Sequence, residues 1–280
     1  MAAPSTAPMN AVFASDDAAM AGFLANQKRL RWRKRLLPAI AVVGIFAIWS
    51  IAVTALHVKP FIAPSPWAVV DVFRDRLDIM LTNLVPTMIE ALLGFTLGNF
   101  LAICVATAFV TRKMVEEAFF PIAVMINTIP IVATAPILVL LLGNGIAPKV
   151  AISAIICFFP TLVNMTRGLR DVNQQALELM RVLSASEAEV FFKLRVKNAL
   201  PYLFSALRIT ASTSVIGAIV GEWIGSNIGI GALIIQATYN FDSALLYASV
   251  VMGSCFSVVF FTIISYVESR TIKWNVVATT

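Results

Sequence analysis

Long apolar stretches alternate with short polar ones along this chain. Residues 36–56 and 91–111 contain no charge, and residues 150–166, 203–225 and 243–267 are apolar over most of their length. A helix that crosses the hydrocarbon core needs about 20 apolar residues, because its backbone polar groups must be satisfied within the segment. Each of these stretches therefore predicts a transmembrane helix.

One more apolar stretch is interrupted by prolines. Residues 118–148 carry no charge, but Pro121, Pro130 and Pro136 fall within them. Proline lacks the amide hydrogen that a helix interior requires, so it kinks or ends a helix. We expect a kinked third span that ends near Leu142. The predicted fold is an all-α, polytopic membrane bundle with about six transmembrane helices.

The polar segments divide this bundle into parts. We predict an N-terminal tail at residues 1–35, partly disordered, a transmembrane domain at residues 36–270 and a C-terminal tail at residues 271–280. Within the domain, residues 168–201 form a long loop. The basic cluster before the first span comes late and the apolar run is of full length, so we expect an uncleaved span instead of a signal peptide.

Composition supports a membrane protein, since 59% of the residues are hydrophobic and 13% are charged. Lys and Arg cluster before the first span, after the second, and in residues 168–201. By the positive-inside rule, the loop and both termini are cytoplasmic, in the inner (plasma) membrane. The formal net charge of +6 then follows from topology and attracts anionic lipid headgroups, so nucleic acid is not an expected partner.

Residues that could carry catalysis are few. Cys104, Cys157 and Cys255 lie in separate spans, and His57 is the only histidine, so neither a metal site nor catalytic residues are predicted. The chain has no phosphate-binding loop with a Gly-Lys-Ser/Thr ending. If ATP drives this protein, another chain binds it.

Some ionisable residues fall within or next to the spans. We place Glu90 and Asp242 at the outer interface, Lys149 in an outer connection and Arg208 near the inner end of the fifth span. Glu222 lies near the outer end of that span, where a structural hydrogen bond and a gate role are both open.

Three glycines accompany Glu222 in the fifth span. Gly217, Gly221 and Gly225 are spaced by four residues, which permits the close approach of a second helix.

The loop after the fourth span has two helical patterns. The first follows Asp171 or Asn173, either of which can cap it, and its apolar residues share one face as far as Leu183. Ser184 and Glu187 read as a capping box that starts a second helix, which reaches Leu200 before Pro201 begins the next span. Because connections between packed helices are usually about 2–8 residues, a loop of this length predicts a contact outside the membrane.

The loop resembles the cytoplasmic signature of permease subunits of binding-protein-dependent ABC importers, in which Glu-Ala-Ala is followed by Gly and later by Leu-Pro. Glu178, Met180 and Leu200-Pro201 match in place, and Ser184 stands where the family usually has Gly.

Further strings resemble the branch that includes nitrate, sulfonate and taurine importers. They run from Ala63-Pro64-Ser65-Pro66 through Asn127-Thr128-Ile129-Pro130 to Gly229-Ile230-Gly231. Their order and spacing together are specific, although each string alone is weak.

The resemblance implies alternating access without chemistry in this chain. A pair of cytoplasmic ATP-binding subunits would hold ATP and Mg²⁺, and an extracytoplasmic binding protein would deliver the solute. Two permeases would enclose the path, either as a homodimer or as this chain with a homologous partner. No cofactor is expected in this chain. The residues expected to couple the ATPase to the spans are Glu178, Met180, Arg181, Ser184, Ala185 and Ser186.

The translocation path is predicted from the proline-broken third span, because broken helices free backbone groups that can face a cavity. Its candidate residues are Asn127, Thr128, Pro130, Thr134 and Glu222. An ordinary kink is the alternative for this span. For the solute, a pyrimidine-like or aromatic molecule is the alternative to nitrate, sulfonate or taurine, and an ion-coupled secondary transporter or a membrane enzyme are the rival classes.

Overall fold

The computed structural model describes residues 32, 36–37 and 39–272, and every element in these residues is helical. The chain divides into two compact units, Met1–Lys59 and Pro60–Thr280. The first unit contains an apolar helix, Ala39–Ala55, within the first predicted span.

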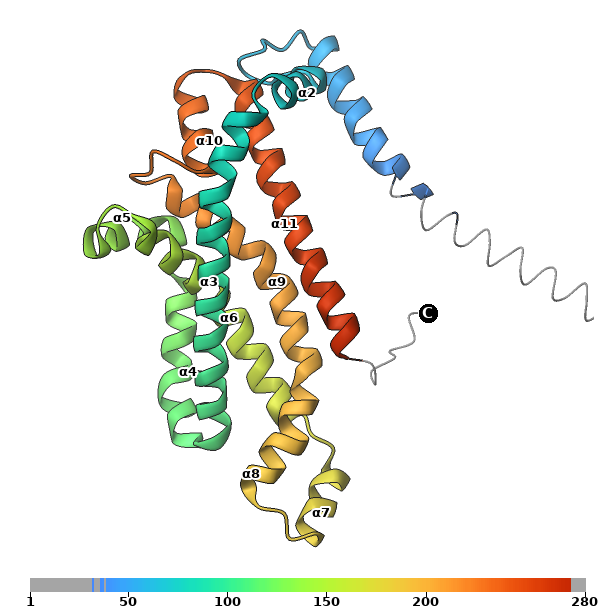
Figure 1. The fold of residues 1–280 in the computed structure, drawn as a ribbon, viewed down its shortest axis with the longest axis vertical. Coiled ribbons are helices and arrows are strands. Elements are labelled where there is room, and N and C mark those ends of the chain that lie inside the picture. Colours follow the sequence, from blue (N-terminus) through green and yellow to red (C-terminus); the bar gives the residue numbers. More distant parts are fainter. Residues whose placement is uncertain (1–31, 33–35, 38, 273–280) are drawn as a thin grey trace, which may run out of the picture. The chain divides into compact units, whose positions relative to one another are not determined.

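The second unit is a bundle of helices (Figure 1). Its elements are α2 (Pro66–Asp75), α3 (Leu77–Thr111), α4 (Lys113–Thr128), α5 (Ile131–Leu142), α6 (Ile146–Arg170), α7 (Gln174–Val182), α8 (Glu187–Glu189), a π-helical segment (Val190–Arg195), α9 (Val196–Glu222), α10 (Ile230–Tyr239) and α11 (Ser243–Thr271).

Four helical segments of this unit are long and apolar enough to cross a membrane: α3, α6, α11 and the segment Glu187–Glu222. The pair of α4 and α5 adds a fifth if it is one broken span. Among the described residues, four or five of the six predicted spans are thus long and apolar enough to cross a membrane, and Ala39–Ala55 is a shorter apolar helix within the remaining one. The expected all-α membrane bundle is confirmed.

The third span ends at Leu142, as predicted, but it is two helices, α4 and α5, bent by 101° relative to each other, because Pro130 follows α4 and its ring excludes a continuous helix. One predicted boundary is wrong. The second loop helix does not stop before Pro201, which lies inside α9. The π-helical segment precedes Pro201 and keeps Glu187–Glu222 continuous.

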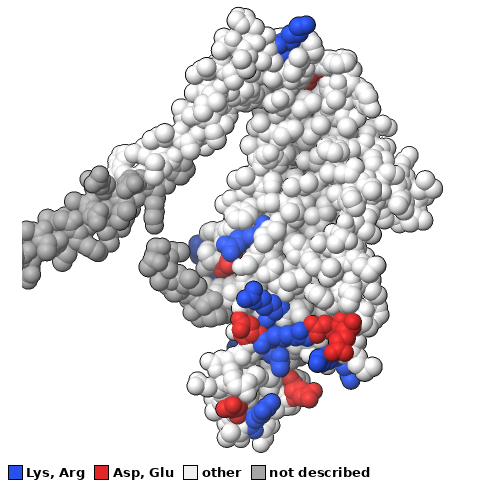
Figure 2. Space-filling view, turned by 180° about the vertical axis from the view of Figure 1, so that it is seen from behind, with Lys and Arg blue, Asp and Glu red and all other residues white. Residues whose placement is uncertain are grey.

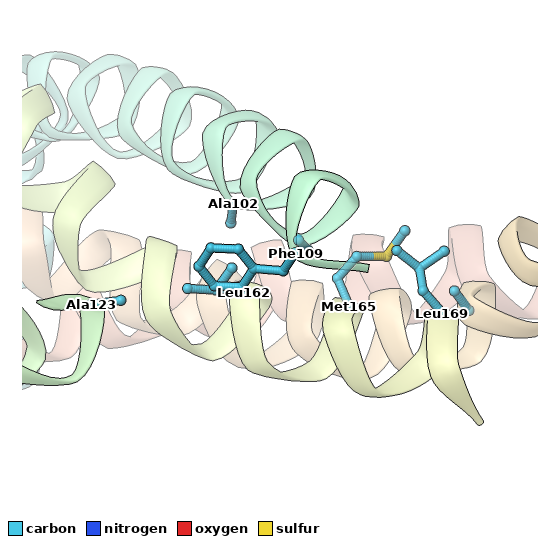
Figure 3. Packing of buried hydrophobic residues seen from close by; sticks show 8 residues of the cluster. Ala102, Phe109, Ala123, Leu162, Met165 and Leu169 are labelled. Carbon is cyan, nitrogen blue, oxygen red and sulfur yellow. The ribbon is translucent and has the colours of Figure 1, made fainter. Parts of the chain in front are cut away.

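Helix α6 packs lengthwise against both α3 and α9, so it forms the centre of the bundle. Toward one end, Phe109 of α3 points at Leu162 of α6, and Met165 and Leu169 continue the cluster (Figure 3). All four side chains are buried. Burial of apolar groups against a neighbouring helix thus fixes the two long helices side by side.

Glycines permit this close packing at the other contacts of α6. A Cβ added at Gly217 would lie 2.7 Å from Cα of Ser153, and one at Gly221 would lie 3.0 Å from Cα of Lys149. The predicted role of these two glycines is therefore confirmed. Gly225 differs, because it follows the end of α9 and has a positive φ of 75°.

Gly98 of α3 offers a test of this packing. We expect Gly98→Ala to lower the free energy of unfolding by about 1–3 kcal/mol, because the new Cβ would lie 2.9 Å from Cα of Ala154 and helices would have to separate. Gly44→Ala is the control, since nothing lies within 4 Å of its added Cβ. Thermal unfolding in detergent measures both, and equal midpoints for the two variants would contradict the packing argument.

Charged side chains gather at one end of the second unit. Figure 2 shows them over the end where α7 and α8 lie, whereas the face above is nearly free of charge. Arg208 pairs with Glu268 of α11 at 3.3 Å near this end. An uncharged band beside a charged end is the surface expected of a membrane-spanning bundle.

Candidate functional site

Helix α7 is the first helix of the loop at residues 168–201. Asn173 is its N-cap, with a side chain that accepts a hydrogen bond from the amide of Gln175 at 2.8 Å. Of the two predicted caps, Asp171 and Asn173, the structure has Asn173. Of the predicted apolar face, Leu177 and Met180 are half-buried, whereas Leu183 is exposed.

The corner after α7 is a Schellman motif built on Ser184. Its φ is +53°, and its amide donates to the carbonyl of Arg181 at 2.9 Å. The amide of Ala185 donates to the carbonyl of Met180 at 3.0 Å. These two bonds satisfy the last carbonyls of α7, and a positive φ at this position normally favours glycine. Ser184 thus adopts the left-handed turn although it has a side chain.

The second loop helix, α8, has Ser186 as its N-cap, so the predicted capping box of Ser184 and Glu187 is wrong. The amide of Glu189 donates to Ser186 Oγ at 3.3 Å, and the amide of Ser186 donates to Glu189 Oε2 at 3.0 Å. The observed capping box lies two residues after the predicted one, because Ser184 adopts the left-handed turn and cannot also be the N-cap. The pKa of Glu189 is lowered to about 2, first by the hydrogen bond from Lys193 and then by Ser186.

The base of the loop is tied to the end of α6. Arg195 donates to the carbonyl of Leu169 at 3.0 Å, and the Asn198 amide group donates to the carbonyl of Gly168 at 3.1 Å. Tyr202 donates to Asp171. Because the last carbonyls of a helix lack partners within it, these bonds both cap α6 and hold the start of α9 against it.

The predicted coupling residues lie together at this end of the bundle. Arg181 and Ala185 line a cavity of about 410 Å³ between the loop and α3. Glu178 is exposed on α7, where its Oε1 accepts a long bond of 3.4 Å from Gln174. The structure therefore leaves the polar face of α7 available for a contact.

The predicted path residues are divided between two places. Thr128 and Pro130 lie at the break between α4 and α5, and the hydroxyl groups of Thr128 and Thr134 donate to carbonyls three residues earlier. Asn127 lines a mainly apolar cavity of about 190 Å³ between α3, α4 and α6. Glu222 is not among the residues of that cavity.

Glu222 holds the start of α10 against α3. Its side chain is fully buried, Oε1 accepts from the hydroxyl group of Thr87 at 2.6 Å, and Oε2 accepts from the amide of Gly231 at 2.6 Å. Thr87 in turn accepts from the amide of Ile230 at 2.9 Å. Amides at a helix N-terminus are natural partners of a carboxylate, so these bonds secure the start of α10.

A buried ion pair adjoins Glu222, and sequence reasoning missed it. Lys149 Nζ lies 3.0 Å from Glu90 Oε1 and 2.7 Å from Ser226 Oγ. Lys149 lies in the first turn of α6 and not in a connection, which corrects the prediction, and Glu90 is buried between helices at 3% exposure. Charged residues are rare in and next to the spans, and the presence of one acidic and one basic residue there was the signal that could have predicted the pair.

The pair borders a cavity of about 510 Å³, called here the Glu90 cavity. It lies between α3, the start of α6 and the connection from α9 to α10, and its lining residues are Val85, Pro86, Ile89, Glu90, Asn144, Gly145, Ile146, Lys149, Gly225, Ser226, Asn227 and Ile228.

A second polar cluster also went unpredicted. Asn99 of α3 accepts hydrogen bonds from the hydroxyl groups of Thr161 of α6 and Thr210 of α9, and all three side chains are buried. It joins the three helices at one level of the bundle. The presence of small polar residues in three apolar spans was the sequence signal for this cluster. Which of them meet depends on how the three helices are aligned with one another in the bundle.

These features define a class: a multi-pass helical membrane protein with an exposed, rigidly rooted loop at one end and buried polar contacts between its spans. Among the described residues no group of three or more His, Cys, Asp or Glu could hold a metal ion.

Comparison with known proteins places the chain within that class. Residues 94–273 match the family model "Binding-protein-dependent transport system inner membrane component". A formylaminopyrimidine transport permease of Halalkalibacterium halodurans is 32% identical over 86% of this chain and 96% of its own length. A putative aliphatic sulfonates transport permease of Bacillus subtilis is 26% identical over 89% of this chain and 90% of its own.

A solved structure has the same fold. A chain of the MetNI methionine ABC transporter covers 74% of this chain and 96% of its own length, with a TM-score of 0.52 and 19% identity. The chain belongs to the family of inner-membrane components of binding-protein-dependent transport systems. It is a permease subunit of an ABC importer for small solutes, in the branch predicted from the sequence.

Proposed function

We propose that residues 168–201 transmit the movement of a cytoplasmic ATPase pair to the membrane helices. The observation that carries this proposal is the hydrogen-bonded corner at Ser184 between α7 and α8, at one end of the bundle (Figure 1). Glu178, Met180, Arg181, Ala185 and Ser186 surround it. The base of the corner is bonded to α6 and continues into α9, so a push on α7 reaches two central helices.

ATP and Mg²⁺ bind to the partner ATPases in this proposal, and the permease itself hydrolyses nothing. ATP shifts the transporter between its two states only as far as its affinity differs between them. The loop and both termini are cytoplasmic, as the distribution of Lys and Arg indicates.

The remaining partners follow from the same scheme. An extracytoplasmic binding protein delivers the solute, and a second copy of the permease completes the path. On α5, Leu140 and Leu141 are 87% and 73% exposed and are available for contact with that copy. Exposed apolar side chains of this size on a membrane helix contact either lipid or another subunit.

The solute is a small molecule of the nitrate, sulfonate or taurine type, or a pyrimidine-like or aromatic molecule. Relatives named for aliphatic sulfonates and for formylaminopyrimidine support these two possibilities in turn. The proposed path includes Asn127, Thr128, Pro130 and Thr134 at the broken span, and Glu222. Selectivity rests mainly with the binding protein.

A cross-linking experiment tests the docking of the loop. In a background without Cys104, Cys157 and Cys255, we expect Glu178→Cys to cross-link to a cysteine placed in the groove of the ATPase, with a yield that changes when ATP is added. Glu117→Cys on α4 is the matched control, because Glu117 is also exposed but lies outside the loop. Equal yields from the two positions would contradict the proposal.

A further inference from the structure

Helix α4 is loosely packed against the rest of the bundle. Of its sixteen residues, all of them described, only Ala123 is buried. Two cavities lie along the seam between α4 and α6. One, of about 500 Å³, lies near the loop end of the bundle (Figure 1), and the other is the apolar cavity of about 190 Å³ that Asn127 lines. Because packed helices leave few voids, an unfilled seam indicates that another molecule fills it.

The two cavities follow each other along both helices. Phe120 and Val163 line the larger one, and Ala123 and Phe159 line the apolar one, about a turn further along α4 and α6. Phe159 lies about 12 Å along α6 from Arg167 of the larger cavity, at a rise of about 1.5 Å per residue. One leaflet of the hydrocarbon core is about 15 Å thick, so the seam runs from a membrane boundary into the hydrocarbon.

Both cavities can be reached from outside the bundle. Arg167 and Val163 of the larger cavity are exposed, and Leu101 and Ile126 of the apolar one are 45% and 48% exposed. Asn127 has the only polar side chain among the residues that line the apolar cavity. Such a wall suits an acyl chain better than a polar solute.

The larger cavity presents one cation and one anion that are not paired with each other. Arg170 and Glu116, which also line it, form an ion pair. Arg167 and Asp171 are both exposed, and neither forms an ion pair within the part of the chain that the structure describes. Asp171 accepts a hydrogen bond from the neutral hydroxyl group of Tyr202. The cavity is therefore complementary to a group that carries both signs of charge.

Arg167 and Asp171 are close enough to bind one small headgroup. The amide of Asp171 donates to the carbonyl of Arg167 at 2.9 Å, and residues one turn apart have Cβ atoms about 5–6 Å apart. We propose that the seam between α4 and α6 binds a phospholipid whose zwitterionic headgroup carries a primary ammonium group, as in phosphatidylethanolamine. The phosphate contacts Arg167, the ammonium group donates to Asp171, and an acyl chain fills the apolar cavity.

The two charges also discriminate against other lipids. The quaternary ammonium group of phosphatidylcholine has no N–H group to donate to Asp171. Phosphatidylglycerol has no cation at all, and its net negative charge is repelled by Asp171 and Glu116. A guanidinium group offers several N–H donors to a phosphate, so Arg167 alone retains some affinity for every phospholipid. The ammonium group then decides the preference.

Native mass spectrometry of the full-length permease, purified in detergent and freed of lipid, tests this inference. The probes are phosphatidylethanolamine, phosphatidylcholine and phosphatidylglycerol with identical dioleoyl chains. We expect phosphatidylethanolamine to be retained at a concentration at least about tenfold lower than the other two, the factor that one charge-assisted hydrogen bond supplies. Glycerophosphoethanolamine, which is the headgroup without chains, is expected not to compete at equal concentration.

Two variants test the headgroup contacts. We expect Arg167→Gln to weaken the binding of phosphatidylethanolamine by roughly tenfold, and Asp171→Asn to abolish its advantage over phosphatidylcholine. Arg112→Gln is the matched control, because Arg112 is exposed next to α4 but does not line the cavity. If a variant does not fold, the comparison of lipids on the native chain still decides.

The seat of the acyl chain has its own test. Leu101→Trp fills the apolar cavity and is expected to weaken lipid retention several-fold. Phe100→Trp is its control, since Phe100 is 62% exposed and does not line that cavity.

The inference is overturned if the other lipids bind as well as phosphatidylethanolamine, if glycerophosphoethanolamine competes as well as the lipid does, or if Arg167→Gln changes nothing. It is also overturned if a second copy occupies the seam, in which case Val163→Cys, in the background without native cysteines, cross-links two permeases and no lipid is retained. The measurements involve neither ATP nor solute, so the proposed function keeps its separate test at Glu178.

Discussion

Ala185→Arg and Glu178→Lys are expected to abolish solute uptake while the permease still inserts into the membrane. Ala185 lies directly after the corner and lines the loop cavity together with Arg181. A long charged side chain at position 185 prevents α7 from docking closely to the ATPase. Truncating or blocking a central interface residue typically costs about 2 kcal/mol or more, which weakens association by roughly 30-fold.

The effect of Glu178→Lys has a different cause. Glu178 is exposed on α7, and among the described residues its side chain makes only a long bond to Gln174, so its replacement does not disturb the fold. Its charge is therefore available to a partner, and reversing it converts an attraction into a repulsion. Loss of function without loss of stability is the distinguishing result.

Uptake and solute-stimulated ATP hydrolysis in proteoliposomes measure both variants. Glu117→Lys is the matched control, because it makes the same charge reversal at an exposed position whose pair with Lys113, at 3.5 Å, contributes at most about 1 kcal/mol. We expect the control to transport normally. Normal uptake and ATP hydrolysis in both loop variants would remove the loop from the coupling mechanism.

Lys149→Met is expected to be the most destabilising single change in the bundle core. It leaves Glu90, which is 3% exposed, without its cationic partner. Removing one member of a buried ion pair costs about 3–5 kcal/mol, because the remaining charge is buried and uncompensated. For a chain of this size, that loss lowers the unfolding midpoint by roughly 10 °C.

The double variant Lys149→Met/Glu90→Gln separates charge from packing. With both charges removed, we expect most of the lost stability to return, since neither group is then left charged and unpaired. Lys113→Met is the control, because its pair with Glu117 is exposed and its loss shifts the midpoint little. Equal destabilisation in the single and double variants, measured by thermal unfolding, would show that Lys149 stabilises the bundle through the packing of its aliphatic chain and not through its charge.

Local sequence signals predicted much of the coupling loop. Asn173 and Ser186 are residues that commonly cap helices, and both were within the predicted loop. The capping box was nevertheless misplaced by two residues. Ser184 and Ser186 are chemically equal candidates, and only the left-handed backbone at Ser184, which is required to turn the chain after α7, assigns the cap to Ser186.

The broken third span shows the same limit in a membrane helix. Pro130 predicted an interruption, because the residue before a proline is driven out of the helical region. The sequence predicted a kink, but not that the two halves would be bent by 101°. That angle depends on the packing of α5 against α6 and α9.

By itself, the sequence determined the all-α membrane fold, the apolar segments and the chemistry of the loop, because hydropathy and capping act over a few neighbouring residues. The tertiary structure alone decided which polar groups meet. Lys149 and Glu90 are separated by 59 positions, and Thr87 and Glu222 by 135. Such contacts arise from the register of packed helices, which close approaches at Gly217 and Gly221 set. A buried charge finds its partner only once that register is formed.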